Sequence, residues 1–370
     1  MCKGKTNSMR PKIYLLLLLG LLLAACESGP RVRMAPGYEA TATPIQSRAN
    51  VMGTPAPTSV PPTPTISPLA LDNKFYTLPS LTLNFYPPQK WTLDNEGSSY
   101  AKFISPDKTA WMEAAVESSG YELSPDDYQT YVDNMVASLY AGAKDYKQLR
   151  REDSGGKTIV SSSFLKSDQK WFSMDVFYQR SQGLYALSFQ AYETVWNTYR
   201  SAFLEIAENV TTQTGYLKPE QIYIFLRTHQ SPSGVYEVTI PLGWSLTRDE
   251  ENLDGGIIET IASPDKKASA EIIILNSQAL LAQKDIGQIS IGLMKERYGV
   301  DLRILSDKVL EDGRIRTDWE NKKTGTSGYT IFWLNGSELN ILTLKFTDEY
   351  PETYREVIDG INSSFVFVKK

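Results

Sequence analysis

The sequence predicts an α+β protein in which two tandem domains follow a disordered tether, each domain an antiparallel sheet flanked by helices. Three observations predict this fold class. The same landmarks occur twice, in the same order. Segments in which apolar and polar residues alternate follow one another across short turns, a pattern typical of antiparallel strands. Helices with a single apolar stripe are expected at matching places in both copies.

The repeated landmarks are turn residues and aromatic residues. They form four pairs: Pro87-Pro88-Gln89-Lys90-Trp91 with Pro241-Leu242-Gly243-Trp244, Ser105-Pro106-Asp107-Lys108 with Ser263-Pro264-Asp265-Lys266, Gly155-Gly156-Lys157 with Asp312-Gly313-Arg314, and Thr198-Tyr199-Arg200 with Thr353-Tyr354-Arg355. Ser, Pro and Asp suit a tight turn, because Pro presets φ and the other two side chains bond local backbone. The spacing predicts two separately folded domains, 72–213 and 216–370.

In the first copy, a strand is expected at 81–85, and further strands on both sides of the Ser-Pro-Asp-Lys turn. A helix should begin after Ser124, with Pro125 in its first position and Asp126 and Asp127 in its first turn. Its apolar stripe comprises Tyr128, Tyr131, Val132, Met135 and Leu139. Strands at 146–152, 157–166, 170–180 and 184–191 should follow. A closing helix should carry Trp196, Tyr199, Phe203, Ile206 and Val210.

The second copy repeats this order. Its first strand is expected at 235–240, and its first helix should carry Ile286, Ile289, Leu293 and Met294. Strands are expected at 301–310, 314–322, 328–334 and 338–346. The closing helix should carry Tyr350, Tyr354, Val357, Ile358, Ile361 and Phe365. Because short turns join successive strands, each sheet should be antiparallel, with two helices to cover it.

Residues 1–25 have the features of a bacterial lipoprotein signal. A basic stretch ends at Lys12, an apolar run extends from Ile13 to Leu23, and Ala24 and Ala25 precede Cys26. We therefore expect cleavage before Cys26, a lipid on its thiol, and a protein on the extracytoplasmic face of the cell membrane. An ordinary signal peptide is the alternative. An uncleaved anchor is disfavoured, because the apolar run is too short for a bilayer core of about 30 Å. Which membrane carries the protein stays open.

Residues 26–71 are expected to be a disordered tether. Nine of the 20 prolines lie between residues 27 and 70, among Thr, Ser and Ala, with no apolar periodicity. Such a segment does not bury enough apolar surface to offset its ordering entropy. Proline keeps it extended, so it should act as a spacer from the bilayer. A proline-rich recognition motif is the alternative.

Composition excludes several kinds of site. The only cysteines are Cys2 and Cys26, and the only histidine is His229, so a thiolate zinc site and a multi-histidine metal site are excluded beyond residue 26. Loss of residues 1–25 moves the net charge from −5 to −9, which disfavours nucleic acid. His229 is expected to be exposed in the connector between the copies. We predict no cofactor, no metal and no catalytic residue.

Two groups of side chains leave alternatives open. Asp126-Asp127 and Asp249-Glu250-Glu251 could bind a cation, although a helix start and a charged loop explain them without one. Aromatic residues are dense in the first copy, and exposed ones would suit contacts with protein or sugar; core packing is the favoured alternative. These aromatic residues are Tyr100, Trp111, Tyr121, Trp171, Tyr178 and Tyr185.

The order of elements resembles the PsbP-like fold, which is shared by photosystem accessory proteins, Ran-binding Mog proteins and bacterial lipoproteins of the LpqN type. The resemblance rests on a strand, Pro-x-Gly-Trp, the Ser-Pro-Asp turn, helix, strands and a terminal helix closing in Ser363-Ser364-Phe365. It covers nearly all of 75–370, once per copy. The first copy departs from it at Pro88-Gln89-Lys90-Trp91, which lacks the glycine. The resemblance implies a non-catalytic binding or assembly module.

Three functions follow from these observations. The first is a membrane-anchored module that binds a protein partner in the cell envelope. The second is a glycan or small-ligand binder that uses exposed aromatic residues or a cleft between the copies. The third is a hydrolase built on a pair of carboxylates, of which one has a raised pKa.

Overall fold

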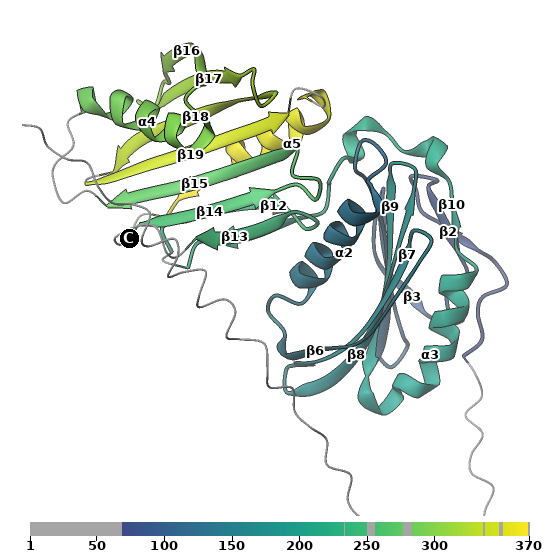
Figure 1. Ribbon diagram of the computed structural model, residues 1–370. Coiled ribbons are helices and arrows are strands. Elements are labelled where there is room, and N and C mark those ends of the chain that lie inside the picture. Colours follow the sequence, from purple (N-terminus) through teal and green to yellow (C-terminus); the bar gives the residue numbers. More distant parts are fainter. Residues whose placement is uncertain are drawn as a thin grey trace, which may run out of the picture. The chain divides into compact units, whose positions relative to one another are not determined.

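The structure is a computed structural model, and it describes residues 69–232, 234–249, 256–276, 283–335, 337–347 and 351–368. The predicted signal segment, Cys26 and all of the tether up to residue 68 lie outside these ranges. The chain from Pro64 onward forms one compact unit. Within it the predicted fold class is confirmed: two tandem α+β domains, each built on an antiparallel sheet (Figure 1).

Each copy contains a seven-stranded antiparallel sheet, and the two sheets have the same strand order. The first runs β3-β4-β5-β9-β8-β7-β6 and the second runs β13-β14-β15-β19-β18-β17-β16. The first sheet comprises β3 (Thr92–Gly97), β4 (Tyr100–Ile104), β5 (Ala110–Ser118), β6 (Lys144–Ser154), β7 (Lys157–Lys166), β8 (Gln169–Arg180) and β9 (Gly183–Tyr192). The second comprises β13 (Ser245–Asp249), β14 (Ile257–Ala262), β15 (Ala268–Asn276), β16 (Arg303–Val309), β17 (Ile315–Asn321), β18 (Thr326–Asn335) and β19 (Glu338–Thr347).

A small three-stranded sheet accompanies each large one. In the first copy β2 (Leu83–Phe85) lies between β1 (Tyr76–Thr77) and β10 (Thr211–Thr212). In the second copy β12 (Tyr236–Pro241) lies between β11 (Leu226–Gln230) and β20 (Val366–Phe367). Each small sheet thus pairs a strand from the start of its copy with one from the end.

Two helices cover opposite faces of the first large sheet (Figure 1). The helix α2 (Pro125–Leu139) buries Tyr131, Val132 and Met135 in a cluster with β7 and β8 residues, while α3 (Glu193–Glu208) buries Phe203 and Ile206 against the other face. In the second copy the same places are taken by α4 (Gln283–Tyr298) and α5 (Pro351–Ser364). The capping prediction for α2 is confirmed, since the Asp127 N–H donates to Ser124 Oγ at 3.2 Å.

The repeated Ser-Pro-Asp-Lys turns have the same geometry in both copies. Ser105 Oγ donates to Asp107 Oδ1 at 2.7 Å, and Ser263 Oγ donates to Asp265 Oδ1 at 2.6 Å. The lysine that follows, Lys108 or Lys266, has φ of 59° in each turn. Both turns connect neighbouring antiparallel strands, as the sequence predicts.

Most element predictions are confirmed to within two residues, and β7 matches the predicted 157–166. The connector between the copies is different, because it contains two short 3-10 helices and the strand β11. Val210 and Phe365 also lie just beyond α3 and α5. Whether the copies fold separately stays a prediction; buried side chains from both belong to one continuous apolar cluster.

Candidate functional site

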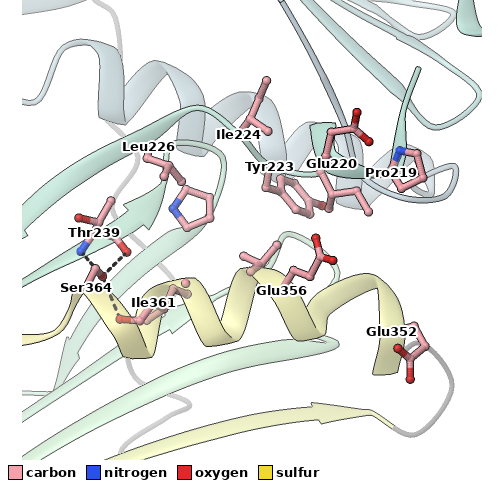
Figure 2. A pocket seen from close by; sticks show the side chains of 14 residues that line it. Pro219, Glu220, Tyr223, Ile224, Leu226, Thr239, Glu352, Glu356, Ile361 and Ser364 are labelled. Carbon is pink, nitrogen blue, oxygen red and sulfur yellow. Dashed lines mark hydrogen bonds between the residues drawn. The ribbon is translucent and has the colours of Figure 1, made fainter. Parts of the chain in front are cut away.

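An apolar groove lies between the connecting segment 219–226, the strand β12 and the helix α5 (Figure 2). We call it the α5 groove. Its volume is about 470 Å³, which lies within the usual range for ligand-binding cavities. The residues that line it are Pro219, Glu220, Ile222, Tyr223, Ile224, Leu226, Thr239, Pro241, Glu352, Glu356, Val357, Gly360, Ile361 and Ser364.

One wall of the groove is a single face of α5. This face carries residues spaced three or four positions apart, which lie on the same side of a helix. They are Val357, Gly360, Ile361 and Ser364. Gly360 leaves this wall open, because a Cβ added there would meet no atom within 4 Å. The wall is fixed at its end by Ser364 Oγ, which accepts from the Thr239 N–H at 2.9 Å.

The opposite wall is an extended segment whose apolar side chains alternate. Ile222, Ile224 and Leu226 line the groove, and Leu226 is 55% exposed. Backbone hydrogen bonds hold this segment on both sides: the Tyr223 N–H donates to Ser118 O at 3.0 Å, and Phe225 O accepts from the Leu242 N–H at 2.8 Å. The backbone of this wall is therefore held in place by its own hydrogen bonds.

The floor is aromatic. Tyr223 is 1% exposed, and its ring packs edge-on against Trp244 and parallel to Tyr354, with centroids 5.8 and 6.3 Å away. Burial raises the pKa of the Tyr223 phenol well above its ordinary value. The Tyr354 phenol beside it acts in the opposite direction. The aromatic packing against Trp244 and Tyr354 holds the ring in place.

The rim is acidic. Glu220, Glu352 and Glu356 are exposed, and none of the described residues that line the groove is a lysine or an arginine. Two of these carboxylates make long ion pairs, Glu220 with Lys218 at 3.9 Å and Glu352 with Arg355 at 3.8 Å. Exposed pairs of this kind are weak. The groove therefore combines an apolar floor with net negative charge at its edge, which suits an apolar group that carries a cation.

His229 was expected to be exposed in the connector, and that expectation is wrong. It lies on β11, its side chain is 12% exposed, and its Nε2 is 3.0 Å from Glu259 Oε2. The reason is strand pairing: β11 adds to β12, and alternation turns Arg227 and His229 inward. The Tyr236 hydroxyl donates to the same Glu259 oxygen, and the three side chains belong to the packing of the second copy.

The structure also places the aromatic and acidic candidates that the sequence suggested. Trp171, Tyr178 and Tyr185 are buried, whereas Tyr100, Trp111 and Tyr121 are half-buried. Asp126 and Asp127 occupy the first turn of α2, where Ser124 caps the helix. Glu250 and Glu251 lie outside the described residues. Within the described ranges, no group of three or more His, Cys, Asp or Glu residues could hold a metal ion.

Three buried or half-buried carboxyls have raised pKa values. Burial raises the pKa of Glu117 to about 7 and that of Asp175 to about 6, although hydrogen bonds to both carboxyls act in the opposite direction. Burial also raises the pKa of Asp265, which accepts from Tyr354 Oη at 2.8 Å. None of the three lines the α5 groove.

The α5 groove was not found from the sequence. Its two walls lie more than a hundred residues apart, and only their pairing through β12 brings them together. One local signal was present: Ile222-Tyr223-Ile224-Phe225-Leu226 is a continuous apolar run in the connector, which indicates a segment that packs against other parts of the protein.

No family model matches the chain, and no curated protein matches it. Among solved structures, it is similar to the PsbP protein of the cyanobacterium Synechocystis sp. PCC 6803, with 15% identity, a TM-score of 0.32, and coverage of 39% of this chain and 93% of that one. It is also similar to PA94 of Pseudomonas aeruginosa, described as a putative regulator, with 13% identity, a TM-score of 0.28, and coverage of 38% and 96%. A protein of Bacteroides thetaiotaomicron matches at 13% identity and a TM-score of 0.27, with coverage of 45% and 53%. The first of these belongs to the family that the sequence resembles.

Proposed function

We propose that this protein is a lipid-anchored, extracytoplasmic binding module that docks an apolar, basic segment of an envelope protein in the α5 groove. The observation that carries the proposal is the groove itself, with its ordered apolar walls and acidic rim. Apolar side chains of a partner would be removed from water there, and lysine or arginine side chains beside them would meet Glu220, Glu352 and Glu356.

Membrane attachment through Cys26 is the second part of the proposal. It is supported by the signal-like segment before Cys26 and by the proline-rich spacer after it. A diacylglycerol supplies two acyl chains, which suffice for stable attachment. No helix in the described ranges is long and apolar enough to cross a membrane. The resemblance to lipoproteins of the LpqN type is consistent with this arrangement.

The two alternative functions have less support. A carboxylate-dependent hydrolase needs a carboxyl of raised pKa in a cavity beside a second acid. Here the carboxyls with raised pKa are held by Tyr131, Tyr140, Ser188 and Tyr354 and lie away from the groove. A glycan binder would use exposed aromatic side chains, and among the described residues that line the groove the one aromatic side chain, Tyr223, is buried.

The docking proposal is tested with a groove-filling variant. Because a Cβ at Gly360 meets open space, Gly360→Leu should fill the groove without disturbing the helix. Gly287→Leu, at an equally open helical position in α4, is the matched control. A photo-crosslinker placed at the exposed Leu226 of the full-length protein in native membranes should capture a partner peptide that is apolar and basic.

We expect Gly360→Leu to abolish that crosslink and Gly287→Leu to preserve it. Replacing Glu220, Glu352 and Glu356 together by glutamine should weaken it and remove its dependence on salt. Capture of the protein's own tether, or a crosslink that survives Gly360→Leu, would count against a partner docked in the groove.

A further inference from the structure

A second cavity lies where the first helix of the first copy ends against the sheet, and we call it the helix-end pocket. Its volume is about 390 Å³. The pocket is lined by residues from β4, β5, β6, β7 and β9, from the end of α2 and from the loops that follow α2 and β7. These residues are Lys102, Trp111, Glu113, Leu139, Tyr140, Gly142, Ala143, Lys144, Phe164, Leu165, Lys166, Ser167 and Gln190. It shares no residue with the α5 groove.

A cavity in the second copy includes the positions that correspond to Glu113, Leu139, Tyr140 and Gln190. Strand pairing fixes the correspondence, because Lys102 faces Glu113 across β4 and β5 just as Thr260 faces Glu271 across β14 and β15. In the same way Trp111 pairs with Gln190, and Ser269 pairs with Lys345. Leu139 and Arg297 also correspond, because each comes directly before a tyrosine at the end of its helix. Tyr140 is the C-cap residue of α2, and Tyr298 is the last residue of α4.

In the second copy, an arginine that lines this cavity neutralises the glutamate that corresponds to Glu113. Arg297 reaches from α4 onto the sheet and forms a two-pronged ion pair with Glu271, and Tyr298 Oη donates to the same carboxylate. The charged residues lining it are Glu271, Glu296, Arg297 and Lys345, two of each sign. The cavity is therefore electrically balanced.

In the first copy the helix-end pocket has an excess of positive charge. Leu139 replaces the arginine, so Glu113 pairs instead with Lys102, at 2.9 Å. Lys144 and Lys166 are exposed, and neither has a carboxylate within ion-pair distance in the described part of the chain. Three lysines against one glutamate line a pocket in a protein that is acidic as a whole.

The pocket also presents an aromatic surface. Trp111 is half-exposed, and its indole is held by Trp171, whose ring centroid is 4.4 Å away. The Nζ atoms of Lys102 and Lys166 lie 5.0 and 4.9 Å from the Trp111 ring centroid. An anion that pairs with the Lys166 ammonium group is thereby brought beside the indole, where a ring attached to the anion has apolar surface to cover.

We propose that the helix-end pocket binds a small organic anion in which a carboxylate or phosphate is attached to a ring. The charged group would lie between Lys144 and Lys166, and the ring would lie beside Trp111 and Leu139. This proposal does not depend on the docking function of the α5 groove. Sugar acids, sugar phosphates and aromatic acids share this chemistry, and the test distinguishes them.

The experiment is a calorimetric titration of the full-length protein, purified in detergent, at low salt. The ring anions are glucuronate, glucose 6-phosphate and 4-hydroxybenzoate; glucose and inorganic phosphate are the controls for ring alone and charge alone. At least one ring anion should bind with a Kd below about 1 mM, and added salt should weaken it. Whichever of the three binds identifies the source of the ring.

The variant pair is Lys144→Ala/Lys166→Ala, with Lys308→Ala/Lys323→Ala in the second copy as a control that removes the same charge. Thermal melts check that both remain folded. Two charge-assisted contacts are lost in the first variant, so its Kd should rise about tenfold or more, and the control should bind as before. Trp111→Phe should weaken ring anions and leave the melt unchanged.

Three results would overturn the proposal. One is the absence of binding by all three ring anions. Another is a Kd that Lys144→Ala/Lys166→Ala leaves unchanged. The third is inorganic phosphate or glucose binding as tightly as the ring anions, since either shows that ring and charge are not recognised together.

Discussion

His229 Nε2 lies 3.0 Å from Glu259 Oε2, and the Tyr236 hydroxyl donates to the same carboxylate oxygen. The side chains of His229 and Glu259 are 12% and 2% exposed, respectively. The lone histidine of the chain thus serves as a polar contact between β11 and β14, and it ties the connector to the second copy. Burial acts to raise the pKa of Glu259, but the hydrogen bonds from His229 and Tyr236 outweigh it, so the pKa is lowered.

Replacing Glu259 by glutamine should lower the free energy of unfolding by about 1–3 kcal/mol at neutral pH, because a charge-assisted contact is lost in a buried site. A carboxyl whose folded pKa is lowered stabilises above its unfolded pKa, and this contribution is lost as pH falls through the folded value. The deficit of Glu259→Gln should therefore shrink in acid. Urea unfolding at pH 7 and pH 3 measures it, with Glu237→Gln as control. A deficit equal at both pH values would contradict the assignment.

The pKa of Glu117 is shifted in the opposite direction from that of Glu259. It accepts hydrogen bonds from Tyr131 Oη at 2.9 Å and from the Phe225 N–H at 3.1 Å, and burial raises its pKa from 4.5 to about 7. Between these values the folded protein keeps a proton that the unfolded chain releases, so Glu117 makes stability fall as pH rises from 4.5 to about 7.

Glu117→Gln imitates the protonated carboxyl and should remove that fall. Relative to the unaltered protein, the variant should gain up to about 3 kcal/mol between pH 5 and pH 8. Urea unfolding over this interval measures the gain. Glu113→Gln, at a half-buried position on the same strand, is the control and should show less change. Parallel curves for Glu117→Gln and the unaltered protein would show that this carboxyl does not titrate in that interval.

Gly328 is expected to be intolerant of any side chain. A Cβ added there would lie 2.1 Å from Leu344 O and 3.1 Å from the Lys345 Cα, both backbone atoms of the neighbouring β19. Since the backbone of a central strand yields only by breaking its pairing, Gly328→Ala should cost about 3 kcal/mol or more. Gly97→Ala, on β3 with nothing within 4 Å, is the control and should be nearly neutral. Thermal melts of the two variants decide the matter.

Cys26→Ser tests the membrane anchor. A serine hydroxyl does not become the thioether on which a diacylglycerol is carried, so the variant should leave the membrane fraction and accumulate unprocessed. Cell fractionation and metabolic labelling with a fatty acid measure this, and Cys2→Ser is the matched control that should retain both label and location. Labelled, membrane-bound Cys26→Ser protein would rule out the lipid anchor at this residue.

Local patterns predicted most of the fold. The alternation of apolar and polar residues predicted β7, and the two Ser-Pro-Asp-Lys motifs predicted both turns. Ser124 and Pro125 predicted the start of α2. The strand β11 was missed because Leu226-Arg227-Thr228-His229-Gln230 contains one apolar residue. Its inward side chains are Arg227 and His229, and hydropathy does not register a polar side chain whose partner lies across the sheet.

The two cavities were beyond local patterns for another reason. The α5 groove needs residues 222–226 and 357–364 to meet, and only β11, β12 and α5 bring them together. The helix-end pocket depends on which residues face one another across β4, β5 and β9. Aligning the copies shows that Leu139 stands where Arg297 does, but the consequence for charge appears only once the sheet register is known.

The small sheets set the order in which the copies can be completed. The first copy lacks a partner for one edge of β2 until Thr211 and Thr212 have emerged, and the second lacks one for β12 until Val366 and Phe367 have emerged. A chain that emerges from its N-terminus therefore finishes the first copy while the second is still incomplete. During that interval β12 has an open edge, and a nascent chain stalled within the second copy, after Pro241 and before Val366, would expose that edge to pairing with other strands.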